Sequence, residues 1–230
     1  MRLSRTLATV IATATLCITL PATPATADAD LVPEIVAEMG MGMTEQQFRT
    51  DLAVAARHLN ATEDDVAQRV LTELKAKQVD GTFIPFAHTL PEARAAGDIA
   101  YVPAPYGGIY GSMMIYATRS TVMDFVAGKI VQRPVGEVKV ARFTRLLSVD
   151  RPDQRRHAAA WAKAQAGKSY DHNFAINKVG LADDRLGVAE LIWRAYRYEG
   201  VNLDDDGGIG AYPIDIYNHP DVTSYKVIKP

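Results

Sequence analysis

The hydrophobic pattern of this sequence changes period near Gly97, and that change limits the class of fold. Between residues 33 and 78, apolar residues recur at the spacing of one helix face. Beyond Gly97, short runs rich in β-branched and aromatic residues are typical of strands, and helical spacing then returns. The strand runs span 98–102, 112–118 and 121–127, and the later helical stretches span 152–166 and 186–199. This order predicts an α+β protein with a mostly antiparallel sheet.

Two helices of the first segment carry start signals. Thr44 precedes one helix with Gln47 three residues on, which is the pattern of a capping box, and Thr62 opens the other helix with Asp64 and Asp65 in its first turn, where the helix dipole favours acids. The spacing predicts a helical hairpin within residues 28–80, ahead of a main domain at residues 81–230. Amphipathic helices of this kind mostly pack on a larger body. The alternative is a hairpin that binds a protein partner.

The first 27 residues have the pattern of a secretory signal peptide. Arg2 and Arg5 precede an apolar run, and Ala25-Thr26-Ala27 supplies the small-x-small pattern of a cleavage site. The apolar run is shorter than the roughly 20 residues that a membrane-spanning helix needs. We therefore expect cleavage after Ala27 and a secreted or periplasmic protein without a membrane span.

The only cysteine of the sequence, Cys17, lies inside this predicted signal peptide. The mature chain would then offer no disulfide, no thiolate ligand for a metal and no cysteine nucleophile. Once Arg2 and Arg5 are removed, 23 of the 25 basic residues remain against 27 acidic ones, a net charge of −4. This charge argues against nucleic acid or an anionic membrane surface as the main partner.

Five segments between residues 95 and 228, taken in chain order, resemble a known enzyme family. They read AGDIAYV, SMMIYATRSTVMDF, AGKSYDHNF, VAELIWRAYRYEGVNLD and YPIDIYNHPDV. The series resembles the circularly permuted papain-like cysteine hydrolases, the YiiX/YaeF branch of the NlpC-like superfamily. The resemblance implies a permuted papain-like core, in which a small, mostly antiparallel sheet packs on helices.

The resemblance also implies where catalytic residues would stand. In that family a cysteine at the start of a helix attacks an amide or ester carbonyl, and a histidine on the facing sheet activates the cysteine. Val188 matches the cysteine position, and Ser112 matches the histidine position, or Gly111 if the hairpin is shifted by one residue. Glu190 is retained from the motif. Because valine cannot attack a carbonyl, the resemblance implies a degenerate member without the catalytic pair.

Aromatic residues are the best candidates for ligand contacts. Tyr101, Tyr106 and Tyr110 belong to a Gly/Pro/Tyr-rich stretch that predicts a surface loop, and Tyr170 and His172 lie in the later turn. Such side chains combine an apolar ring with a polar tip, which suits a groove that binds sugars or peptides. We expect a non-catalytic protein that binds cell-envelope peptide, glycan or lipid conjugate in the former active-site cleft, with no cofactor.

An active hydrolase that works without cysteine is the alternative to this binding function. Ser112 is its candidate nucleophile, with His88 or His172 as the base. None of the serines after the signal peptide lies in a Gly-x-Ser-x-Gly motif, so the sequence alone offers no further support for a serine nucleophile.

One acidic stretch partly matches a calcium-binding loop. Asn202, Asp204 and Asp206 occupy alternate positions, and Gly207 follows. The twelfth position is Pro213, where such a loop needs a glutamate. We therefore expect a solvated acidic turn after the helix, and no metal site.

Overall fold

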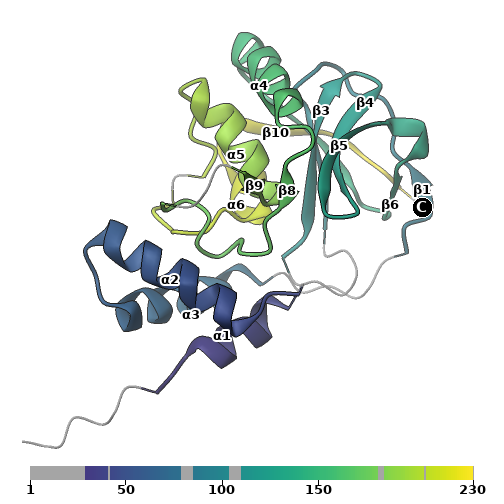
Figure 1. Cartoon of the computed structure of the whole chain (residues 1–230). Helices are drawn as coiled ribbons and strands as arrows, with labels where there is room; N and C mark the ends of the chain where they lie inside the picture. Colours follow the sequence, from purple (N-terminus) through teal and green to yellow (C-terminus); the bar gives the residue numbers. More distant parts are fainter. Residues whose placement is uncertain are drawn as a thin grey trace, which may run out of the picture.

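The computed structural model describes residues 29–40, 42–78, 85–103, 110–180, 184–204 and 206–229. These residues form a three-helix unit and a larger body built on a curved sheet (Figure 1). The predicted signal peptide and Tyr106 lie outside the described residues. Among the described helices, none combines the length and apolar character of a membrane-spanning helix.

The N-terminal unit holds one helix more than the predicted hairpin. Its helices are α1 (Val32–Met39), α2 (Glu45–Leu59) and α3 (Glu63–Lys77). The capping box predicted at Thr44 forms in part, because the Thr44 hydroxyl accepts a hydrogen bond from the Gln47 N–H at 3.2 Å, whereas Thr62 forms a complete capping box with Asp65. The additional helix, α1, packs on both α2 and α3.

Eight strands form one sheet in the order β10-β7-β2-β3-β4-β5-β8-β9, and β8 and β9 are its only parallel neighbours within the described residues. The predicted strand runs agree with β2, β3 and β4 to within one residue. The bounds are β2 (Ile99–Val102), β3 (Ser112–Thr118), β4 (Thr121–Val126), β5 (Lys129–Pro134), β7 (Arg145–Val149), β8 (Ser169–Tyr170), β9 (Arg185–Leu186) and β10 (Val222–Val227). A separate antiparallel pair joins β1 (His88–Thr89) and β6 (Lys139–Val140), and the 3-10 turn η2 (Val135–Glu137) precedes β6.

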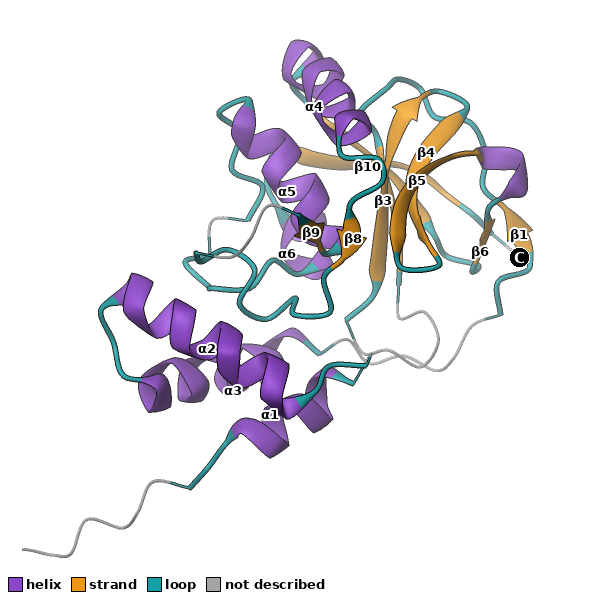
Figure 2. Ribbon diagram, viewed as in Figure 1, coloured by secondary structure: helices purple, strands orange, loops and turns teal. Residues whose placement is uncertain are grey.

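Helices cover one face of the sheet and the β1–β6 pair covers the other. The helices are α4 (Pro152–Ala164), α5 (Val188–Tyr198) and α6 (Pro213–Asn218). Both α4 and α5 pack against β3, as Figure 2 shows. The core on this face includes Met113, Ile115 and Leu191, whereas Leu90, Met114 and Val140 belong to the core on the opposite face. The architecture is therefore α+β, as predicted.

The Gly-Asp pair at the start of β2 holds several elements together. Asp98 is fully buried, and its carboxylate accepts hydrogen bonds from two preceding backbone N–H groups and from the Tyr225 hydroxyl at 2.9 Å. The Gly97 carbonyl accepts a bond from the Tyr196 hydroxyl at 2.7 Å. A Cβ on Gly97 would lie 2.1 Å from the Arg155 carbonyl oxygen. This motif pair therefore joins β2 to α4, α5 and β10.

One hydrophobic core extends from the helical unit into the main body. It contains buried side chains of α1, α2 and α3 together with residues of the main body. The contributors from the main body are Tyr110, Ala175, Ile176, Ile209 and Tyr212. The helical unit is thus joined to the rest of the chain by a continuous apolar interior.

Candidate functional site

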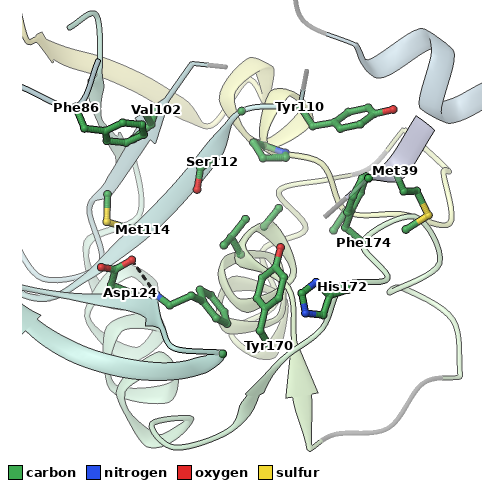
Figure 3. A pocket seen from close by; sticks show the side chains of 18 of the residues that line it. Met39, Phe86, Val102, Tyr110, Ser112, Met114, Asp124, Tyr170, His172 and Phe174 are labelled. Carbon is green, nitrogen blue, oxygen red and sulfur yellow. Dashed lines mark hydrogen bonds between the residues drawn. The ribbon is translucent and has the colours of Figure 1, made fainter. Parts of the chain in front are cut away.

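A cavity of about 720 Å³ opens at the N-terminus of α5. Its volume falls within the range of about 300–1,000 Å³ that is usual for small-molecule sites. Several parts of the chain form its wall: the end of α1, Phe86, the sheet from the end of β2 to β5 with the segment that follows, residues 170–174, and the starts of α5 and α6. Figure 3 shows the side chains that line this cavity.

The start of α5 contributes an aliphatic surface. Val188 and Ala189 are its first two residues, and both line the cavity. Gly187 has no side chain to cap the helix, and the carboxylate of Glu190 accepts a hydrogen bond from the Gly187 N–H at 2.8 Å. The same carboxylate pairs with Arg194 at 2.8 Å. Burial raises the pKa of Glu190 to about 8, although Arg194 acts in the opposite direction.

Glu190 therefore supports the helix and does not reach a ligand. It is 1% exposed and is not among the residues that line the cavity. Its contacts fix the first turn of α5, which presents Val188 to the cavity.

Ser112 faces the same cavity from the first position of β3 (Figure 3). Its hydroxyl makes no hydrogen bond within the described part of the chain. His88 lies in β1 and does not line the cavity. His172 does line it, but its ring lies perpendicular to the ring of Tyr170, with the ring centroids 4.7 Å apart. A serine without a hydrogen-bonded base is a weak nucleophile, so this arrangement does not favour the hydrolase alternative.

The predicted ligand-binding aromatic residues do not all lie together. Tyr110, Tyr170 and His172 line the cavity. The expectation of a surface role is wrong for Tyr110, which is 8% exposed, and for Tyr101, which is 3% exposed and does not line the cavity. Its ring stacks on a tyrosine of α6 at a centroid distance of 4.8 Å. The loop that follows β2 was expected to leave Tyr101 exposed, but every residue of β2 is buried.

Sequence reasoning missed most of the other residues in the wall. Met39 and Phe174 lie at the end nearest α1, and Phe86, Val102 and Met114 lie at the sheet end (Figure 3). No local pattern singles out these side chains, because each is an ordinary apolar residue of its own segment. Only the fold brings them to one cavity.

Charged side chains also enter the wall at the sheet end. Arg133 pairs with Asp124 at 2.7 Å, and its second guanidinium nitrogen donates to the Glu137 carbonyl at 2.8 Å. Lys139 donates a hydrogen bond to the Thr89 hydroxyl at 2.7 Å. Two cations and one carboxylate therefore line this end of the cavity.

The acidic stretch outside the cavity is buried in part: Asp204 is buried, which corrects the expectation of a solvated turn at that residue, whereas Asp206 is exposed as expected. Asp204 is 4% exposed, and oxygen atoms of Asp204, Asp206 and Asp215 lie within 4.8 Å of one another. Lys178 bonds to Asp204 at 2.5 Å, and Lys77 bonds to Asp206 at 2.7 Å and also to Asp215. Burial raises the pKa of Asp204 to about 7, against the effect of Lys178. The two ammonium groups neutralise much of the negative charge of this cluster. The ion pair between Lys77 and Asp215 links α3 to α6.

Comparisons with known proteins give two similarities. No protein-family model matches the chain. The uncharacterized protein YycO of Bacillus subtilis (strain 168) is 24% identical over 247 residues, which cover 99% of this chain and the full length of YycO. A crystal structure of the metalloprotein YiiX from Escherichia coli O157:H7 aligns with a TM-score of 0.42 and 16% identity, over 61% of this chain and 99% of YiiX. The chain is thus similar to YycO along almost its whole length and to YiiX along about three fifths of it.

Proposed function

We propose that this protein is an exported, non-catalytic relative of the permuted papain-like hydrolases. It binds a cell-envelope peptide, glycan or lipid conjugate in the cavity at the start of α5. The observation that carries this proposal is Val188, because its aliphatic side chain lines the cavity at the position that the resemblance gives to the attacking thiol. A cavity of about 720 Å³ is large enough to hold a ligand of this kind.

The surroundings of Val188 support binding without catalysis. Glu190, the retained motif residue, is held by Gly187 and Arg194 below the cavity wall. Within the described residues the Ser112 hydroxyl has no hydrogen-bonded base. The cavity wall thus offers apolar contacts and a few polar groups, which is the usual composition of a binding site.

Binding is tested by placing a charge inside the cavity. Glutamate is well tolerated in the first turn of a helix, so Val188→Glu should fold while it blocks the cavity. Soluble peptidoglycan fragments and a lipid extract of the same envelope are dialysed against the protein, and bound compounds are identified by mass spectrometry. We expect retention by the wild type and loss of retention in Val188→Glu.

The matched control is Ala160→Glu, which adds the same charge at an exposed position of α4. This variant should retain the same compounds as the wild type. Equal retention by Val188→Glu would show that the cavity is not the binding site.

Absence of catalysis is tested by a thiol placed at the former nucleophile position. We expect Val188→Cys alone to show no thiol-dependent hydrolysis of amide or ester substrates, because no histidine stands at position 112 to activate the thiol. Turnover by this single variant would contradict the assignment of positions 188 and 112.

A serine-reactive fluorophosphonate probe tests the hydrolase alternative directly. We expect no labelling of the wild type, because Ser112 lacks a base within the described residues. Labelling that disappears in Ser112→Ala would instead identify a serine hydrolase.

A further inference from the structure

The cavity has an apolar passage between two ends of opposite charge. Val188 and Ala189 line this passage at the start of α5. Met39 and Phe174 line its end near α1 (Figure 3). Methionine and aromatic side chains adapt well to flexible apolar ligands. Hydroxyl-rich ligands need hydrogen-bond partners in a buried site, and this passage supplies few of them. The lining therefore favours a hydrocarbon chain over a sugar.

The charge at the sheet end is not balanced. Asp124 neutralises Arg133 through a contact of 2.7 Å. Lys139 forms no ion pair with the described residues, and its ammonium group donates a hydrogen bond to the neutral hydroxyl of Thr89. This end of the cavity thus carries a net positive charge that complements an anionic group on a ligand.

The other end of the cavity has the opposite character. Glu38 lines the wall there and accepts a hydrogen bond from Gln78 at 2.9 Å. Met39, Tyr110 and Phe174 supply the remaining wall near it, and the rings of Tyr110 and Phe174 lie 5.0 Å apart. An anionic group is disfavoured beside Glu38, so the two ends of the cavity give the ligand a direction.

We propose that the ligand is a single-chain anionic amphiphile, such as a long-chain carboxylate. Its carboxylate lies at the sheet end beside Lys139, its chain crosses the aliphatic start of α5, and its far end lies against Met39 and Phe174. This inference rests on the proposed function, because it assigns one class of ligand to the same cavity.

A fluorescent fatty acid, 11-(dansylamino)undecanoic acid, is the probe for this inference. Its emission should rise and shift to the blue in the presence of the wild type, and palmitate should displace it. Val188→Glu should abolish the signal, because it puts a carboxylate in the passage. Thermal unfolding of each variant verifies that the fold is intact.

Lys139→Gln tests the position of the carboxylate. Lys139 is exposed and makes one hydrogen bond, so its replacement should leave the fold unchanged. We expect the affinity for palmitate to fall about fivefold to tenfold, as is usual for the loss of one charge-assisted contact. The affinity for methyl palmitate, which has no charge, should not change. Lys163→Gln, at an exposed position of α4, is the matched control and should behave as the wild type.

The outcomes separate this inference from the proposed function. If the fatty-acid probe does not bind while peptidoglycan fragments do, the amphiphile is wrong and the proposed function stands. If neither class of compound binds, both fail. If Lys139→Gln still prefers palmitate to its methyl ester, the proposed direction of the ligand is wrong. If Val188→Glu still binds the probe, the ligand lies outside this cavity.

Discussion

Glu190 lies below the cavity wall, and its contacts give this residue of the hydrolase-like motif a structural role. Its carboxylate closes the first turn of α5 through Gly187 and reaches Arg194 at 2.8 Å. Gly97 and Asp98 are similar, because their contacts join β2 to its neighbours. At the scale of single residues, these motif positions serve the fold.

The raised pKa of Glu190 predicts a pH dependence of stability. The pKa rises from the ordinary value of 4.5 to about 8, so the folded state binds more protons than the unfolded state between these values. The contribution of Glu190 is therefore full below about pH 4.5 and is lost as the pH rises through about 8. Relative to Glu190→Gln, the free energy of unfolding of the wild type should fall by up to about 1.4 kcal/mol per pH unit. Urea unfolding of both proteins at several pH values measures this difference in the free energy of unfolding. A difference that stays constant with pH would contradict the prediction.

Gly97 predicts a steric effect that a second glycine can isolate. Gly97 and Gly128 have φ values of +86° and +74°, so alanine is strained at both positions. A Cβ at Gly97 meets the Arg155 carbonyl, whereas a Cβ at Gly128 meets no atom within 4 Å. We expect Gly97→Ala to lower the free energy of unfolding by about 1–3 kcal/mol more than Gly128→Ala does. Equal losses in chemical denaturation would show that the backbone conformation alone matters.

At the scale of elements, local signals predicted α2, α3 and the strands β2 to β4. Capping threonines and clear changes of hydrophobic period made these elements visible in the sequence. The separate helix α1 was less visible, because the residue before it provides no side-chain cap and the sequence predicted only a two-helix hairpin within residues 28–80. The resemblance suggested Val188 and Ser112, but Met39 and Phe174 reach the cavity only through tertiary packing.

The buried ion pair between Lys178 and Asp204 should contribute more than an exposed pair. Lys178→Met leaves Asp204 buried without its closest cation, which typically costs about 3–5 kcal/mol. Lys75→Met removes an exposed partner of Glu34 at 2.7 Å and should cost at most about 1 kcal/mol. Thermal and urea unfolding compare the two variants. Similar losses of unfolding free energy in the two variants would mean that burial does not make this ion pair more stabilising than an exposed one.

At the scale of the whole molecule, the helical unit and the main body share a hydrophobic interior. Lys77 adds ion pairs to this contact, and Asn173 donates a hydrogen bond to Asp51 of α2 at 2.8 Å. Deleting the helices would expose this interior. The alternative of a protein partner that binds the helical unit is therefore better tested with substitutions on its exposed face.

The shared interior predicts a single cooperative unfolding transition. Both tryptophans of the sequence, Trp161 and Trp193, lie in the main body, so their fluorescence reports on that part. Far-ultraviolet circular dichroism also detects the three N-terminal helices. The two signals should change at the same urea concentration, as two-state unfolding requires. Loss of helical signal before the fluorescence change would show that the helical unit unfolds by itself.

The end of α1 lines one part of the cavity, and α1 lies outside the sheet that forms other parts of the wall. Substitutions at residues 38–40 would therefore reshape one end of the cavity and leave the sheet end and the start of α5 as they are. Chains with this architecture could diverge in ligand choice through so short a segment, and selectivity would then evolve independently of the scaffold.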